Sequence, residues 1–288
     1  MADGNSWEKS VRPMSGSEFK RLSEFIRSQC GIKMPPAKKA MLEARLQKRL
    51  KSLGITLFEE YCDYLFNFND RDSENELVQM INAVTTNKTD FFREPVHFHF
   101  LTETVLPEYI TTGGAGKKFT VWSAGCSTGE EPYSLAMVLN ECALRFPGFR
   151  FSILATDIST KVLEQARLGI YEQKQAEAIP PHLREKYLMR SKDRSKKLVR
   201  IVPRIRSLVC FDRLNLMDEH LGLPQPADAI FCRNVIIYFE REEQEKLLGR
   251  LCRSLKPGGH LFLGHSETVV GFNLPLIRET SKVYRKVE

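Results

Sequence analysis

The sequence predicts an α/β protein in which a small all-helical domain precedes a doubly wound, mostly parallel sheet. Residues 17–85 show only helical periodicity. From Phe119 onward, short apolar runs rich in β-branched and aromatic residues alternate with amphipathic segments, as strands and helices do in a parallel sheet. The chain has 288 residues, which is enough for one large α/β domain and one smaller domain.

Composition narrows the class of protein. Hydrophobic residues make up 42% of the chain and charged residues 27%, which is ordinary for a soluble protein. No apolar run approaches the roughly 20 residues of a membrane span. Residues 1–16 are polar and lack a signal-peptide core, so we expect a disordered lead-in there. The seven cysteines form no Cys-x-x-Cys pair, which indicates reduced thiols in a cytoplasmic protein.

Charge and histidine content point to partners and cofactors. The formal net charge of +7 indicates an acidic partner surface, although it does not distinguish nucleic acid from protein. His97 and His99 lie two residues apart with no further cluster of metal ligands nearby in the sequence. We therefore expect no metal site.

Four helices are expected in the first domain, and residues 86–95 are expected to link it to the rest of the chain. The expected helices are 17–30, 35–53, 57–68 and 73–84. Ser17 suits the N-cap of the first helix, and Ser73–Glu76 has the pattern of a capping box for the last. The helix that follows the linker is expected to start within Phe91–Pro95.

The second helix carries a basic arc beside its leucine stripe. The proposed docking residues on this arc are Lys38, Arg45, Lys48 and Arg49. Glu43 is the only acidic residue among them. A charged arc is usually a solvated face, whereas a nearly uniform sign is also typical of a docking face. The sequence leaves both interpretations open.

The candidate ligand site is the segment Phe119–Ala136. Its first six residues are typical of a buried strand, and Gly125 and Gly129 then supply a turn. Glu130–Pro132 suits the first turn of a helix, where carboxylates are favourable and proline loses no needed N–H. A strand, a glycine turn and a helix in succession form a ligand-binding edge of a doubly wound sheet.

Three ligands compete for this loop. A phosphate-binding loop needs a lysine that is missing here, and a dinucleotide fingerprint needs a third glycine. S-adenosylmethionine (AdoMet) carries no phosphate and is cationic at its sulfonium and ammonium groups, so it tolerates the adjacent Glu130 and Glu131. The loop resembles the first motif of class I AdoMet-dependent methyltransferases, but Ser123 replaces the usual acidic residue and Ser127 the middle glycine. The alternative interpretation, a tight turn between strand and helix that binds no ligand, also remains open.

The remaining elements follow from periodicity and from turn residues. Expected strands are 151–155, 198–202, 207–211, 228–232, 260–265 and 282–287, and expected helices are 130–146, 161–168, 180–190 and 240–255. Ser159 is the expected N-cap of the helix 161–168. The alternation in 198–202 predicts an antiparallel subdomain at about 188–210. A terminal hairpin is typical of Rossmann-like class I methyltransferases and foreign to a plain dehydrogenase.

Several stretches together resemble one family, the CheR type of chemotaxis receptor methyltransferases, which methylate glutamates on bacterial chemoreceptors. The matching stretches are 86–94, 122–134, 155–158, 215–216, 230–239, 255–259 and 264–267. The resemblance runs from about residue 17 to the end. It implies an AdoMet-binding domain at 96–288, S-adenosylhomocysteine as product, and a protein-glutamate O-methyltransferase activity.

The resemblance also implies site residues. AdoMet contacts are expected at Asn87, Thr89, Arg93, Glu131, Asp157, Asn215, Leu216, Arg233 and Asn234. Asp157 suits the ribose hydroxyls, Glu131 the ammonium group and Asn215 the adenine edge. Arg93 can pair with a carboxylate, either of the cofactor or of the incoming glutamate, and Tyr238 is a second candidate for orienting the substrate. Purely structural roles remain open: Asp157 as a helix cap, Asn215 as a turn former, Arg93 as a helix-start charge, and Tyr238 as a core tyrosine.

The chemistry explains why no catalytic base is expected. A glutamate side chain has a reference pKa near 4.3 and is already ionised at neutral pH. It can therefore attack the methyl group without a base, and the matched motifs contain no Ser-His-Asp, Cys-His or metal constellation. The enzyme has to align the reactants and remove water from the carboxylate.

The two alternative functions are a nucleic-acid methyltransferase and a non-catalytic AdoMet-binding regulator. Amino-directed nucleic-acid methyltransferases carry Asn/Asp-Pro-Pro-Tyr/Phe where this chain has Arg233–Ile236, and no cysteine follows a proline as cytosine carbon-5 enzymes require. A non-catalytic AdoMet-binding regulator stays open. The expected partner is the helical cytoplasmic domain of chemoreceptors, with no nucleic acid and no membrane insertion. We expect a cytoplasmic monomer recruited to membrane-bound receptor arrays, and the turn 191–197, which lacks glycine, does not support tethering by a receptor peptide.

Overall fold

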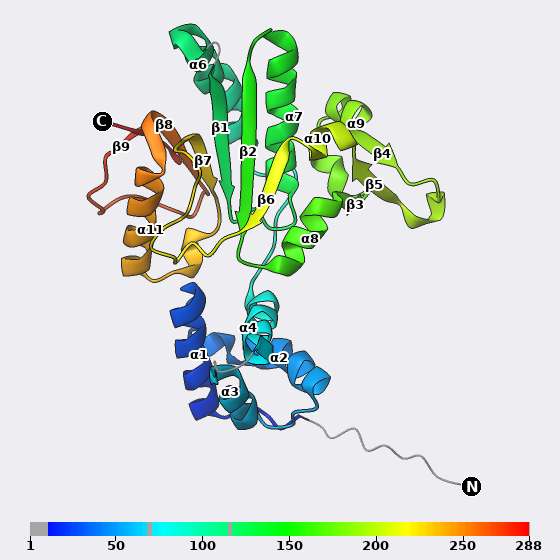
Figure 1. The fold of residues 1–288 in the computed structure, drawn as a ribbon, viewed down its shortest axis with the longest axis vertical. Coiled ribbons are helices and arrows are strands. Elements are labelled where there is room, and N and C mark those ends of the chain that lie inside the picture. Colours follow the sequence, from blue (N-terminus) through cyan, green and yellow to red (C-terminus); the bar gives the residue numbers. More distant parts are fainter. Residues whose placement is uncertain (1–10, 68–70, 115–116, 288) are drawn as a thin grey trace. The chain divides into compact units, whose positions relative to one another are not determined.

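Figure 1 shows the computed structural model, which describes residues 11–67, 71–114 and 117–287. The chain divides into two compact units between Thr86 and Asn87. None of the helices in the described ranges is both long and apolar enough to cross a membrane. The first ten residues of the expected lead-in, and Phe68 of the expected third helix, lie outside the described part.

The described part of the first unit contains four α-helices. They are α1 (Gly16–Cys30), α2 (Lys39–Leu53), α3 (Phe58–Phe66) and α4 (Arg71–Val84), with a short 3₁₀ turn at Pro36–Lys38 before α2. Every helix buries an apolar stripe, and Leu42, Leu46 and Leu50 of α2 are fully buried. Gly54 ends α2 in the left-handed conformation, as its sequence position predicts.

Two predicted helix caps are wrong. Ser15, not Ser17, is the N-cap of α1, because its hydroxyl accepts from the Glu18 amide at 3.2 Å while the Glu18 carboxylate accepts from the Ser15 amide. Ser73 lies inside α4 and does not cap it. Glu76 points to α2 and α3 instead, where its carboxylate accepts from Arg49 and from the Tyr61 hydroxyl.

The second unit is built on a seven-stranded sheet with the order β6-β2-β1-β7-β8-β10-β9 (Figure 1). Its strands are β1 (Lys118–Ala124), β2 (Arg150–Asp157), β6 (Val209–Arg213), β7 (Ala227–Cys232), β8 (Leu255–Leu263), β9 (Leu276–Thr280) and β10 (Val283–Lys286). The first five strands in this order are parallel, and β10 is antiparallel to both of its neighbours. This confirms the predicted doubly wound sheet with a terminal antiparallel hairpin.

Helices cover the sheet and position its loops. They are α5 (Pro95–Phe100), α6 (Leu106–Tyr109), α7 (Glu130–Arg145), α8 (Thr160–Leu168) and α11 (Arg241–Arg253). α7 packs against β2, and α11 packs against β8. The Ser159 hydroxyl caps α8 by accepting from Val162, as predicted.

A separate three-stranded antiparallel sheet follows α8, and its bounds differ from the expected 188–210. Its strands are β3 (Ile170–Glu172), β5 (Leu198–Ile201) and β4 (Leu188–Arg190), in that order. The helix expected at 180–190 stops at Tyr187, because the next three residues pair with β5. The strand expected at 207–211 forms β6 of the large sheet and not part of the insertion.

The helix expected at 240–255 and the strand expected at 260–265 also differ in their bounds. α11 stops at Arg253 and β8 already starts at Leu255, so the segment 256–259 belongs to the strand. A register shift between Ala227 and Ala229 of β7 accommodates it. A Cβ at Gly259 would lie 2.9 Å from the Lys256 carbonyl oxygen and 3.1 Å from that of Asp228, so the crowded backbone favours glycine there.

Candidate active site

The glycine loop between β1 and α7 lies at the carboxyl edge of the parallel strands. Gly125 has φ 81° and Gly129 has φ 97°. A Cβ at Gly125 would lie 2.5 Å from Val235 Cγ2, so both conformation and space require glycine. The amides of Gly125 and Cys126 donate to the Thr156 carbonyl at 2.8 and 2.9 Å, which ties the loop to the end of β2.

Asp157 connects the glycine loop to the start of α8. Its Oδ2 accepts from the Ser127 amide at 2.8 Å and its Oδ1 accepts from the Ser159 amide at 2.9 Å. Only 9% of the residue is exposed. Burial raises the pKa of this carboxyl, and the two backbone hydrogen bonds oppose that rise. A carboxylate has about four acceptor sites, so these hydrogen bonds do not use its full capacity to accept a hydroxyl.

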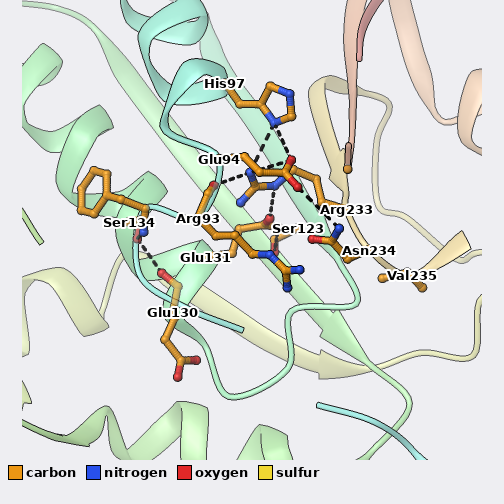
Figure 2. Close-up of polar contacts among 12 residues, drawn as sticks. Arg93, Glu94, His97, Ser123, Glu130, Glu131, Ser134, Arg233, Asn234 and Val235 are labelled. Atoms are coloured by element: carbon orange, nitrogen blue, oxygen red, sulfur yellow. Dashed lines mark hydrogen bonds and ion pairs between the residues drawn. The ribbon is translucent and has the colours of Figure 1, made fainter. Parts of the chain in front are cut away.

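A buried polar cluster lies beneath the loop (Figure 2). The Ser123 hydroxyl donates to Glu131 Oε1 at 2.7 Å, and Arg233 Nε donates to Glu131 Oε2 at 2.6 Å. Ser123 occupies the position of the acidic residue in the class I motif, and the carboxylate that it contacts comes from α7. Glu131 and Arg233 therefore bind each other, and their predicted contacts with the cofactor stay predictions.

The segment before α5 lies against the glycine loop. The Ser127 hydroxyl donates to the Asn87 carbonyl oxygen at 3.0 Å. Arg93 is half-buried, and its Nη1 donates to the Lys88 carbonyl at 3.0 Å. The structure thus brings Asn87 to the loop that Asp157 holds, and Arg93 to Arg233, while Thr89 is half-buried and lies between them in the sequence.

The turn around Arg93 has an unusual backbone. Phe92 and Glu94 have φ of 51° and 56°, so both neighbours of Arg93 are left-handed although neither is glycine. Ser127 and Asn234, at the same sheet edge, also have positive φ. Such conformations cost about 1–3 kcal/mol each and persist only where the surroundings determine them. Their concentration here supports a functional role for this edge.

The loop after β7 carries Asn234 and Tyr238 and is fixed by Glu267. The Glu267 carboxylate accepts from the amides of Asn234, Val235, Ile236 and Gly264, at 2.6–3.0 Å. Only 2% of Glu267 is exposed. Tyr238 ends a short 3₁₀ turn and is half-buried, so it is not a fully buried core tyrosine.

The remaining predicted cofactor residues follow β6. Asn215 Oδ1 accepts from the Met217 amide at 3.1 Å, which is the geometry of a turn former. Leu216 is 7% exposed, and its carbonyl accepts from Arg250 at 2.8 Å. The predicted contact of Asn215 with adenine and that of Leu216 with the cofactor stay predictions.

The predicted docking residues lie in the helical unit and differ in their surroundings. Arg45 Nη1 donates to the carbonyl oxygens of Val84 and Thr85, at 2.6 and 3.0 Å. Arg49 forms an ion pair with Glu76, whose side chain is 3% exposed. Lys38 is half-buried, and burial lowers its pKa. Lys48 is exposed.

Several site residues were not predicted from the sequence. They are Ser123 as a hydrogen-bond donor, Glu94, His97 and Glu267. His97 is fully buried, and burial lowers its pKa to about 4, so it is neutral at neutral pH. Glu94 and Glu267 lie in stretches that match the family, but nothing in their spacing indicates which amides they bind.

The loop chemistry fits AdoMet. The site has carboxylates at Glu130, Glu131 and Asp157, and the loop lacks the lysine that a phosphate would need. In the described ranges no group of three or more His, Cys, Asp or Glu residues could hold a metal ion. The sheet order with its terminal hairpin, together with this loop, defines a class I AdoMet-dependent methyltransferase.

Comparison with known proteins identifies the family. Residues 87–284 match the CheR methyltransferase SAM-binding domain, and residues 17–85 match the CheR methyltransferase all-alpha domain. The chain therefore belongs to the CheR methyltransferase family, and its cofactor is AdoMet.

Curated relatives agree along most of their length. The chemotaxis protein methyltransferase of Escherichia coli K12 is 40% identical over 88% of this chain and 85% of the relative. That of Salmonella typhimurium LT2 is 38% identical over 93% of this chain and 88% of the relative. The chemotaxis protein methyltransferase of Borreliella burgdorferi is 38% identical over 88% of this chain and 89% of the relative. These relatives support AdoMet-dependent methylation in chemotaxis.

Proposed function

We propose that this enzyme transfers the methyl group of AdoMet to glutamate side chains of bacterial chemoreceptors and forms glutamate methyl esters for sensory adaptation. The observation that carries the proposal is the placement of Arg93. It is a half-buried cation at the cofactor edge, where the other arginine, Arg233, is already paired with Glu131. A cation there can orient an incoming carboxylate, which the acidic residues would repel.

AdoMet, when bound, supplies an electrophilic methyl group. Asp157 would hold its ribose, and Asn87, Thr89, Asn215, Leu216 and Asn234 would complete its surroundings. Arg93 and Tyr238 would hold the substrate carboxylate in line with the methyl group. No proton has to be removed from an ionised glutamate, so no catalytic base is required. His97, which contacts Arg233, is fully buried.

The basic arc of α2 supports docking of an acidic receptor helix in a narrower form than the sequence suggests. Arg45 and Arg49 are engaged by their own domain. Docking would therefore rest mainly on exposed Lys48, with half-buried Lys38 as a second contact before the start of α2. Exposed contacts of this kind act on encounter rate and register and are screened by salt. The enzyme would act in the cytoplasm at receptor arrays, as a monomer.

The test is a transfer assay with tritiated AdoMet, offering chemoreceptor membranes or nucleic acid as the acceptor. We expect base-labile label on receptor glutamates and none on nucleic acid. Label on nucleic acid alone would support a nucleic-acid methyltransferase. AdoMet binding without transfer to either would support a non-catalytic regulator.

Arg93→Ala tests the role of this residue. If Arg93 orients the glutamate, kcat should fall by more than about tenfold while AdoMet affinity changes little. If it only clamps the cofactor, affinity should fall and kcat at saturation should survive. Arg253→Ala, at an exposed position of α11, is the matched control and should behave like the wild type. Unchanged kcat and affinity in Arg93→Ala would remove it from the site.

A further inference from the structure

The carboxylate of Glu94 lies at a junction of three elements beside Arg93 (Figure 2). Oε1 is 3.2 Å from the His265 amide and 3.5 Å from Asn234 Nδ2. Oε2 is 3.6 Å from Arg233 Nη1 and 3.4 Å from His97 Nδ1. The loops after β7 and β8 and the helix α5 thus meet at one side chain, which is 7% exposed.

Arg233 links this junction to the main chain of Arg93. Its Nη1 donates to the Arg93 carbonyl oxygen at 2.5 Å and lies 3.2 Å from His97 Nδ1. A guanidinium has no acceptor, so His97 Nδ1 accepts and the ring is the neutral tautomer with hydrogen on Nε2. Glu131 holds the other side of the guanidinium through Nε. Two carboxylates, those of Glu94 and Glu131, therefore flank one buried arginine.

The backbone shows why such fixing is needed. Arg93 stands between two left-handed residues, and Glu94 itself has φ 56° and ψ 65°. A non-glycine residue in this region relaxes unless other contacts hold it. The Phe92 amide is held by the Ser134 hydroxyl at 3.0 Å, and Glu94 holds the other end of the turn.

We propose that Glu94 is a positioning residue: its carboxylate, bound by Asn234, Arg233 and the His265 amide, fixes the turn that presents Arg93 to the substrate. This inference rests on the proposed function, in which Arg93 orients the glutamate. Glu94 does not act on the reacting atoms itself. Its effect on catalysis passes through the position of Arg93.

Three variants separate the carboxylate from the backbone. Glu94→Gln keeps the shape and removes the charge, Glu94→Ala removes the group, and Glu94→Gly removes it while allowing a left-handed backbone. We expect all three to lower kcat for receptor methylation at least about tenfold, with AdoMet affinity by calorimetry within about threefold of the wild type. Glu103→Gln, an exposed glutamate of the same helical segment, is the control. Normal kcat in Glu94→Gly would overturn the role of the carboxylate.

A double-mutant cycle tests the route through Arg93. In an Arg93→Ala background, Glu94→Gln should lower kcat no further, because the residue that it positions is gone. Multiplying losses would show that Glu94 acts independently and would overturn the proposal. Melting temperatures show whether a variant is unfolded at the assay temperature. For such a variant, kcat is measured for both variant and wild type at a temperature below the variant's unfolding transition. If Glu94→Gln is normal while Arg93→Ala is inactive, the positioning role fails and the proposed function stands; if the wild type does not methylate receptors, the proposed function fails.

Discussion

Glu130 provides a test of the electrostatics of the cofactor loop. It starts α7, is 1% exposed, and its Oε2 accepts from the Thr128 hydroxyl at 2.6 Å. Burial raises its pKa to about 7, and the nearby charge of Asp90 adds to the rise. The folded protein therefore retains a proton between about pH 4.5 and 7 that the unfolded chain releases. The free energy of unfolding should consequently fall as pH rises through this window.

The magnitude follows from the shift. A pKa raised from 4.5 to about 7 corresponds to about 3 kcal/mol at pH 8, since each pKa unit is worth about 1.4 kcal/mol. Glu130→Gln removes the ionisable group and keeps a carbonyl oxygen for Thr128. An unpaired amide N–H would offset about 1 kcal/mol. We therefore expect the variant to be more stable than the wild type by about 2 kcal/mol at pH 8, with the advantage falling as pH falls and turning into a small deficit near pH 4.5.

The assay is urea unfolding from pH 5 to 8.5, followed by tryptophan fluorescence in a Trp7→Phe background, so that the signal comes from Trp122, which is buried in β1. His97 and His260, whose pKa values burial lowers to about 4, give the opposite slope below pH 6.5. They are common to both proteins, so the difference between the two curves isolates Glu130. Parallel curves for wild type and variant would refute the reasoning, and Glu103→Gln should follow the wild type.

The remaining predictions concern the cofactor and the helical domain. Asp157→Ala should weaken AdoMet binding by about 1–3 kcal/mol, the scale of lost charge-assisted hydrogen bonds; calorimetry showing unchanged affinity in a folded variant would contradict its assignment. Arg49→Ala should destabilise the helical domain by about 2–4 kcal/mol, because buried Glu76 loses its cation, and should be detected as an earlier thermal transition. Lys48→Ala should leave stability within about 0.5 kcal/mol but raise KM for receptor and flatten its salt dependence. A normal KM and salt response in Lys48→Ala would indicate only a solvated face.

Local patterns in the sequence predicted what local physics determines. The glycine turn, the strand that ends in Asp157 and the Ser159 cap depend on neighbours within a few residues, and all are confirmed. The prediction of the N-cap residue was wrong where two serines lie within one turn, as Ser15 and Ser17 do at the start of α1. The strand at 188–190 was missed because its structure depends on pairing with β5, which overrides local preference.

The interior of the site could not be predicted in this way. Arg233 lies 102 residues from Glu131 and 140 from Arg93 along the chain, and only the folded sheet brings them together. The same holds for the basic arc of α2. Arg49 has the pattern of an exposed cation, but its partner Glu76 is 27 residues away on α4. Sequence periodicity shows which residues share a face but not which charges are already neutralised.

Because Glu267 binds the backbone of two loops, it limits which segments can be exchanged between related enzymes in a chimera. One carboxylate saturates the amides of Asn234, Val235, Ile236 and Gly264, so the segments after β7 and β8 share a single anchor. A side chain at Gly264 would also lie 2.5 Å from Asn234 Nδ2. A chimera that receives one of these loops without the other would bury unmatched donors or a steric clash. The loops after β7 and β8 therefore depend on each other, and a functional chimera has to take both from the same relative.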